Sequence, residues 1–190
     1  MHRDFIIVIG NQGAGKSVWT KAYSAPKTRL LVFDPLASYP VDFTTEPDQY
    51  IPDISDGKRA EFKVGTYLAE ELPLFGSTAF AAGNCTFIIE ECGVIFRRGE
   101  TLEEWARRLI FMGRHRECSL VLVAQRASSI PVDVRSQASR IVTFRQVEPD
   151  DVKSVSERIG KQYREQIPNL PDLECLDWEG GEIRNYTVTP

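Results

Sequence analysis

Residues 5–17 read Phe-Ile-Ile-Val-Ile-Gly-Asn-Gln-Gly-Ala-Gly-Lys-Ser, and this stretch decides the fold. Its first five residues are apolar and β-rich, which predicts a fully buried strand that ends at Gly10. The remainder fits Gly-x-x-x-x-Gly-Lys-Ser/Thr at every fixed position. A helix is predicted from Lys16 to about Tyr23, because Pro26 stops it. A strand, a glycine-rich turn and a helix, in this order, are the context in which the motif cradles phosphate.

The residue types of this turn, a P-loop, are those that phosphate binding needs. Glycines let the chain curl so that backbone N–H groups point at phosphate oxygens, and the positive end of the following helix adds to the attraction. Lys16 is expected to reach the β- and γ-phosphates, and Ser17 to offer a hydroxyl to Mg²⁺. With ATP and Mg²⁺ as expected cofactors, the predicted nucleotide-binding residues are Gly10, Asn11, Gln12, Gly13, Ala14, Gly15, Lys16, Ser17 and Val18.

Further strands and helices are predicted downstream of the P-loop. Short apolar runs predict strands at 30–33, 61–64, 86–89, 120–124 and 141–144. A capping box at 101–104 opens a helix to about Arg116, with Trp105, Leu109 and Met112 on its buried face. Pro149 can open a helix that runs to about Ile159. We read 37–56 as a long irregular connection and 68–72 as a helical turn or two.

Buried strands that alternate with helices indicate an α/β fold with a mostly parallel sheet and helices on both faces. Near the carboxyl terminus, 176–178 and 183–187 flank Glu-Gly-Gly-Glu, which predicts a β-hairpin. The length suits one domain, 1–190, with a core over about 5–160 and a hairpin extension over about 173–189. In such sheets ligands lie at the carboxyl ends of the strands, where the polar motifs of this chain also fall.

Two acidic residues, Glu90 and Glu91, close the predicted strand 86–89. This is the form of a Walker B strand, in which one acid helps hold Mg²⁺ and the next orients or deprotonates the attacking water. Glu90 is one methylene longer than the Asp that usually stands on the metal side, and Glu91 is the predicted catalytic base. Gln125 ends the strand 120–124, where it could sense the γ-phosphate or could be a surface glutamine.

Composition excludes several classes of function. The chain has 190 residues, a net charge of −4 and a pI of about 5.3, whereas a freestanding nucleic-acid binder is usually basic. Neither a signal-peptide pattern nor a membrane-spanning apolar run is present in the sequence. None of its four cysteines forms a Cys-x-x-Cys pair, which favours reduced thiols in a cytosol-like compartment. Its two histidines suggest no metal site.

Four segments resemble the FtsK–HerA superfamily of P-loop ATPases, above all the genome-packaging ATPases of tailless, membrane-containing double-stranded DNA viruses. They are GNQGAGKS at 10–17, LLVFDP at 30–35, FIIEE at 87–91 and, most specific, GRHRECSLVLVAQRASSIPVDVRSQASRIVTFR at 113–145. Together they span roughly 5–160. Two departures are Ala127, where the family has the proline of Gln-Arg-Pro, and Glu90, where it has Asp.

The resemblance implies a three-layer P-loop NTPase of the RecA-like (ASCE) type that works as a ring-forming, ATP-driven DNA motor. It places Lys16 and Ser17 on nucleotide and metal, Glu90 on the metal and Glu91 on catalysis. Gln125 falls on the family's sensor glutamine. Arg114 matches a candidate arginine finger that acts on a neighbouring subunit, with Arg140 as the alternative.

The same resemblance implies partners and a location. These are double-stranded DNA, a homo-oligomeric ring of six or five subunits that could be monomeric in isolation, and capsid-vertex or portal proteins. The expected locations are the packaging vertex of the virion and the host cytoplasm, with membrane association only indirect, through the virion. Residues 37–60 and 97–100 are candidates for contact with DNA or a partner.

Three other functions fit the residues less well. A filamentous-phage assembly ATPase similar to zonula occludens toxin normally carries a transmembrane segment. A P-loop small-molecule kinase needs an acceptor pocket, whereas the paired glutamates and Gln125 favour water as the acceptor. A GTPase-type switch needs an Asn-Lys-x-Asp guanine reader, which this sequence lacks. An isolated chain that awaits its neighbour's arginine would bind nucleotide and turn over slowly.

Overall fold

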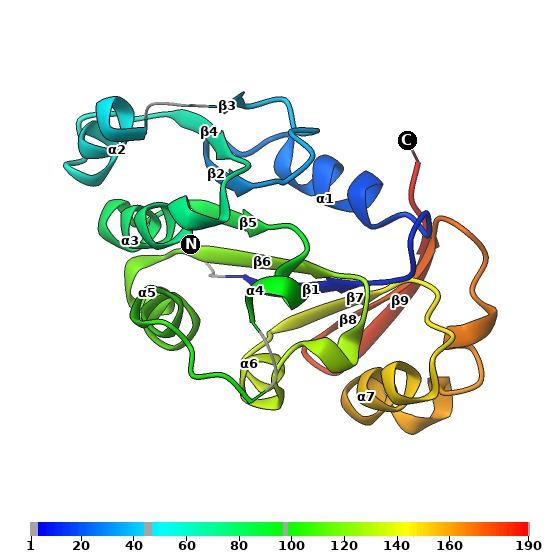
Figure 1. Cartoon of the computed structure of the whole chain (residues 1–190). Coiled ribbons are helices and arrows are strands. Elements are labelled where there is room, and N and C mark those ends of the chain that lie inside the picture. Colours follow the sequence, from blue (N-terminus) through cyan, green and yellow to red (C-terminus); the bar gives the residue numbers. More distant parts are fainter. Residues whose placement is uncertain (1–3, 44–46, 97–98, 190) are drawn as a thin grey trace. The chain divides into compact units, whose positions relative to one another are not determined.

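The computed structural model describes residues 4–43, 47–96 and 99–189 (Figure 1). The chain divides into two compact units, and its segments alternate between them. The first unit comprises Met1–Phe5, Ser24–Glu90 and Thr101–Val121, and the second Ile6–Tyr23, Glu91–Glu100 and Leu122–Pro190. Neither unit is one continuous piece of chain, and the single domain over 1–190 stays a prediction.

The first unit is built on strands in the order β3-β4-β2-β5-β6. Their bounds are Asp42–Phe43 for β3, Phe62–Thr66 for β4, Arg29–Phe33 for β2, Thr86–Ile89 for β5 and Ser119–Ala124 for β6, whose first residues belong here. β2 pairs in parallel with β4 on one side and β5 on the other, and β3 extends the parallel set beyond β4. Because β2 and β5 are almost wholly buried, they form the core of this unit.

The helices of the first unit are grouped around one long apolar helix. They are α2 (Pro47–Ser55), the 3₁₀ turn η1 (Ala69–Glu71), α3 (Leu72–Ala82), α5 (Glu104–Arg107), the π-helical turn η2 (Arg108–Met112) and the 3₁₀ turn η3 (Gly113–Arg116). Both α2 and α5 pack against α3. The reading of 37–56 as irregular is therefore wrong over α2, where the helix tolerates Pro52. The apolar residues of α3 have little helical periodicity, so its full length escaped the pattern.

The segment 101–116 differs from the regular, capped helix that the sequence predicts. Its helix begins after Glu103, without a side-chain cap, so the capping box at Thr101 is not formed. Trp105 and Leu109 are buried as expected, but Met112 is 50% exposed. The π-helical turn explains this difference, since its wider turn rotates the following residues away from the face that a regular helix would present.

The second unit contains strands in the order β6-β1-β7-β8-β9. β1 (Phe5–Ile9) pairs in parallel with β7 (Arg140–Thr143), and β7 pairs antiparallel with β8 (Glu174–Glu179). β8 and β9 (Glu182–Thr187) form the predicted hairpin, drawn red in Figure 1. Gly180 and Gly181, with φ of 59° and 96°, supply the backbone that a two-residue hairpin turn requires.

The helices of the second unit begin with the one that follows the P-loop. They are α1 (Lys16–Ser24), α4 (Cys92–Ile95), the 3₁₀ turn η4 (Ala127–Ser129), α6 (Val132–Ser136), α7 (Pro149–Ile159) and the 3₁₀ turns η5 (Lys161–Tyr163) and η6 (Ile167–Asn169). α7 begins at Pro149, as predicted, and packs against η4. The mostly parallel α/β fold with a C-terminal hairpin is thus confirmed.

Candidate nucleotide-binding site

The P-loop lies between β1 and α1 in the second unit, as the motif predicts. Gly13 and Gly15 have φ of 76° and 122°, a region that other residues rarely adopt. The turn is closed by a hydrogen bond from the Ala14 N–H to the Asn11 oxygen, 3.2 Å long. Gln12, Gly13 and Ser17 are exposed and Val18 is half-buried. The loop therefore has the curled backbone and the accessible hydroxyl that a phosphate site requires.

Phe144, just beyond the end of β7, explains why two positions of the motif must be glycine. A Cβ on Gly10 would lie 2.6 Å from the Phe144 Cβ, and one on Gly15 would lie 2.7 Å from its Cε1. Such distances are too short for any side chain. The loop is also tied to the C-terminal segment, because the Leu173 N–H donates to the Ala14 oxygen at 2.9 Å.

Lys16 is largely buried within the loop that it serves. Its Nζ donates to the main-chain oxygens of Gly10 at 2.8 Å and Asn11 at 3.1 Å. The ammonium charge is thereby held beside the backbone that curls around a phosphate, on a flexible stem that can follow an oxygen anion.

Glu91 and Gln125 come together in the second unit. Gln125 follows β6, and its Nε2 donates to Glu91 Oε1 at 3.0 Å. Glu91 has φ of 51° and ψ of 37°, a left-handed conformation at the start of α4. Unusual backbone conformations of this kind cluster at functional sites. Gln125 is exposed, and this contact makes it a partner of the predicted base.

Gln146 joins this group, although no motif includes it. The side chain is completely buried beyond the end of β7. Its Nε2 donates to the main-chain oxygen of Gln125 at 2.9 Å and approaches Asn11 Oδ1 at 3.4 Å. Its Oε1 has no hydrogen-bond partner in the part of the chain that the structure describes. A buried polar atom left unpaired costs about 1–3 kcal/mol.

Glu90, the predicted metal-side acid, belongs to the first unit. Its N–H donates to the Phe33 oxygen, which extends the pairing of β5 with β2 by one residue. The carboxylate is buried, and the Tyr39 hydroxyl donates to its Oε1 at 2.5 Å. Tyr39 follows a turn built by Asp34, whose carboxylate accepts the N–H groups of Leu36 and Ser38. The Asp of the LLVFDP segment thus shapes the loop that carries Tyr39.

The candidate arginines differ in what their side chains do. Arg114 is exposed in η3 of the first unit, where its Nε donates to His115 at 3.4 Å. Arg116 instead donates to the Phe80 and Ala81 oxygens at the end of α3, a structural role. The neighbouring candidates Arg97 and Arg98, together with 44–46 of the segment 37–60, lie outside the described residues.

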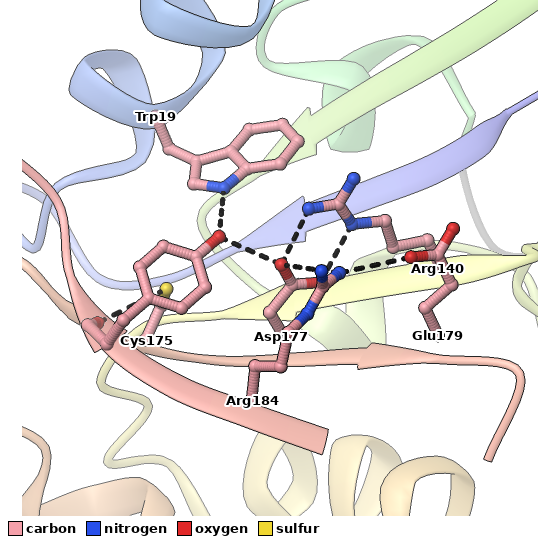
Figure 2. Close-up of polar contacts among 7 residues, drawn as sticks. Trp19, Arg140, Cys175, Asp177, Glu179 and Arg184 are labelled. Atoms are coloured by element: carbon pink, nitrogen blue, oxygen red, sulfur yellow. Dashed lines mark hydrogen bonds and ion pairs between the residues drawn. The ribbon is translucent and has the colours of Figure 1, made fainter. Parts of the chain in front are cut away.

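Arg140 makes a paired contact inside the second unit, shown in Figure 2. Its Nε and Nη2 donate to the two carboxylate oxygens of Asp177 at 2.8 and 2.6 Å, and its guanidinium lies 5.1 Å from the centre of a Trp19 ring. Tyr186 donates to Asp177 and accepts from Trp19 Nε1. Burial lowers the pKa of Arg140, but the Asp177 hydrogen bond and charge outweigh it and raise that pKa.

The register of the strands also separates Arg140 from the P-loop. Arg140 pairs with Ile6 and Thr143 with Ile9, so Arg140 lies at the end of β7 opposite to the one that the P-loop follows. An arginine that already clamps β7 to β8 is poorly suited to leave its carboxylate for another subunit. Of the two finger candidates, Arg114 is the exposed residue, whereas the Arg140 side chain is only 18% exposed.

Within the described ranges, no cluster of three or more His, Cys, Asp or Glu side chains could bind a metal ion by itself. Mg²⁺ at a nucleotide site usually takes most of its ligands from phosphate and water. All four cysteines are buried free thiols. Across the ranges that the structure describes, no helix is both long and apolar enough to cross a membrane.

No family model matches the chain, and no curated protein matches it. Solved structures do. The genome packaging NTPase B204 from Sulfolobus turreted icosahedral virus 2, in complex with AMPPCP, is 20% identical with a TM-score of 0.82 over 98% of each chain. VirB4 of Thermoanaerobacter pseudethanolicus is 8% identical with a TM-score of 0.67, over 98% of this chain and 89% of that one. The chain has the fold of a P-loop NTPase.

A further match extends this result. The N-terminal domain of zonular occludens toxin from Neisseria meningitidis is 10% identical with a TM-score of 0.56, over 100% of this chain and 95% of that domain. The resemblance inferred from the four motifs is thus confirmed as a likeness of fold. Sequence patterns missed Tyr39 and Gln146, because neither belongs to a spaced motif and each acts only through a tertiary contact.

Proposed function

We propose that this protein is an ATP-driven motor that translocates double-stranded DNA into a preformed viral capsid. The observation that carries the proposal is the hydrogen bond between Glu91 and Gln125 in the unit that also holds the P-loop. A carboxylate and an amide in this pairing can together hold and deprotonate a water molecule. The likeness to a viral genome packaging NTPase in complex with AMPPCP supports the same conclusion.

The roles of the residues follow from their chemistry. Residues of the run 10–18 bind ATP, with Lys16 on the β- and γ-phosphates and Ser17 as a ligand of Mg²⁺. Glu91 acts as the base and Gln125 orients the water. Glu90 keeps its predicted part in metal binding, with one carboxylate oxygen steadied by Tyr39. When bound, Mg²⁺ neutralises charge that builds up on the phosphates.

The larger assembly is part of the same proposal. We infer a homo-oligomeric ring, a hexamer or a pentamer, in which Arg114 of one subunit completes the ATP site of the next. Arg140 is the weaker candidate, because Asp177 already binds it. The ring would dock on the capsid vertex or portal and work in the virion and the host cytoplasm. An isolated subunit would bind ATP but turn it over slowly.

Two substitutions test the ATP site. Lys16→Ala should abolish binding of a fluorescent ATP analogue and turnover, because it removes the charge that meets the phosphates. Glu91→Gln should still bind the analogue, while phosphate release falls by about 10²–10⁴-fold, the usual contribution of a general base. Glu157→Gln, on the exposed face of α7, is the matched control and should leave both unchanged. Normal turnover by Lys16→Ala would refute the site, and normal turnover by Glu91→Gln would require another base.

Measurement of DNA-stimulated turnover separates a motor from a kinase. Phosphate release by the wild-type chain should rise when double-stranded DNA is added, whereas candidate small acceptors should have no effect. Glu91→Gln should abolish the stimulated rate as well as the basal rate. Transfer of phosphate to a small acceptor, with no response to DNA, would favour the kinase alternative.

A further inference from the structure

Gln146 has contacts that fold alone does not require. The side chain is completely buried, and its Nε2 faces three acceptors: the main-chain oxygen of Gln125 at 2.9 Å, Asn11 Oδ1 at 3.4 Å and the main-chain oxygen of Arg145 at 3.4 Å. Two of these three are main-chain oxygens, which can only accept and cannot be exchanged for a donor by turning a side-chain amide. The amide therefore cannot be reversed, because its own oxygen would then face the Gln125 carbonyl.

The orientation leaves Oε1 as a buried acceptor without a partner in the described part of the chain. Nearly all buried polar atoms in proteins are hydrogen-bonded, and an exception calls for a reason. The donor side of the same amide is crowded while its acceptor side is unused. This imbalance indicates a group that has a second arrangement available to it.

The neighbours of the Gln146 amide belong to the P-loop and to the Glu91–Gln125 pair. Asn11 is the first variable residue of the P-loop, and its N–H donates to the Arg145 oxygen at 2.9 Å. Gln125 offers its main-chain oxygen to Gln146 and its side chain to Glu91. The Gln146 amide thus lies between the loop that cradles phosphate and the pair that would activate water.

We propose that Gln146 is a positioning residue that transmits the state of the P-loop to the Glu91–Gln125 pair. This rests on the ATPase function proposed above. When phosphate draws the loop closed, Asn11 can turn its Nδ2 toward the unused Oε1, so that the two amides pair through both of their edges. The Gln146 Nε2 then keeps hold of the Gln125 carbonyl and fixes the direction of the Gln125 side chain.

Gln146→Met tests this link, because methionine has similar length and shape but neither donates nor accepts strongly. We expect kcat to fall by about tenfold or more, while the Kd for a fluorescent ATP analogue changes by less than about threefold. The melting temperature should stay close to that of the wild type, since the substitution removes the unpaired Oε1 together with the Nε2 hydrogen bond. Gln137→Leu, at an exposed glutamine after α6, is the control and should change none of these quantities.

A double-mutant cycle separates positioning from general support of the fold. In a Gln125→Ala background the side chain that Gln146 directs is gone. Adding Gln146→Met there should therefore lower kcat by less than about a further twofold. Gln146→Glu is the second variant, because it keeps the shape but puts a carboxylate oxygen against the Gln125 carbonyl. It should lower kcat and spare nucleotide affinity in the same way.

Three results would overturn the inference. Equal losses of kcat in both backgrounds would show that Gln146 acts independently of the Gln125 side chain. An unchanged kcat in Gln146→Met would show that it transmits nothing. A loss of turnover that merely follows a lower melting temperature would make it a structural residue. The proposed function fails separately, if Lys16→Ala still hydrolyses ATP.

Discussion

Glu91, the proposed base, has an unusual backbone conformation. A left-handed conformation at a residue other than glycine costs on the order of 1–3 kcal/mol, and it persists only where the surroundings enforce it. Here the residue ends the run after β5, begins α4 and accepts a hydrogen bond from Gln125. The backbone sets the direction in which the side chain leaves the main chain, and the hydrogen bond from Gln125 orients the carboxylate.

The ion pair of Arg140 with Asp177 should contribute to the stability of the fold. Arg140→Ala leaves Asp177 buried without its bidentate partner, and breaking such a pair costs about 3–5 kcal/mol. The free energy of unfolding, measured by urea titration, should fall by roughly that amount. Turnover per folded molecule should be unchanged if Arg114 is the finger.

Arg184 supplies the control for that experiment. It contacts the same Asp177 at 3.4 Å, but its side chain is 58% exposed, against 18% for Arg140. Arg184→Ala should therefore cost less than about 1 kcal/mol. Equal losses for the two variants would show that burial does not decide the strength of these ion pairs.

At the scale of elements, the packing of α3 against α5 depends on one glycine. A Cβ on Gly76 would lie 2.2 Å from Cε3 of Trp105, so the helix carries no side chain where the indole rests on it. Trp105 is itself fixed by a hydrogen bond from its Nε1 to Glu103. The two helices can approach closely only because that site is empty of side-chain atoms.

Gly76→Ala should destabilise the protein even though alanine favours helix. The helical preference contributes up to about 1 kcal/mol. Forcing a methyl group into the indole costs about 1–3 kcal/mol, so a net loss is expected. Thermal unfolding of Gly76→Ala is compared with that of Ser77→Ala, at an exposed neighbouring position in the same helix. The second variant reports the helical preference without a contact with the indole. A raised melting temperature for Gly76→Ala would mean that Trp105 can move aside.

At the scale of the whole molecule, the proposed ring predicts complementation between subunits. Arg114→Ala should lose turnover alone because each site lacks its neighbour's guanidinium, which is worth about 10³–10⁵-fold in related chemistry. Mixing it with Lys16→Ala, which keeps Arg114 but has a dead P-loop, should restore part of the phosphate release. Arg164→Ala, an exposed arginine, is the control that should need no rescue.

The mixing experiment also has a clear negative result. If mixed assemblies of Arg114→Ala and Lys16→Ala stay inactive over a range of ratios, Arg114 does not act on a neighbouring subunit. Sedimentation of the same mixtures, with and without DNA, would show whether a ring had formed at all. Inactive rings would contradict the role of Arg114, and the absence of rings would contradict the assembly.

Local pattern was sufficient for much of this protein. The apolar run of β1, the glycines of the P-loop and the Gly180-Gly181 turn each require a backbone that neighbouring residues dictate, and the structure agrees at all three. Where local patterns conflicted or were absent, prediction failed. The π-helical turn exposed Met112, and α2 formed around Pro52.

The sequence by itself determined the glycine-rich turn, the buried strands and the acidic strand end, because these depend on residues that are close together in the chain. Only the tertiary structure decided which polar groups meet. In the folded chain Arg140 pairs with Asp177, Tyr39 donates to Glu90 and Gln146 donates to the main chain of Gln125. Such partners lie far apart along the chain. Their pairing is set by the register of strands and the burial of charge, and neither can be read from the periodicity of the sequence.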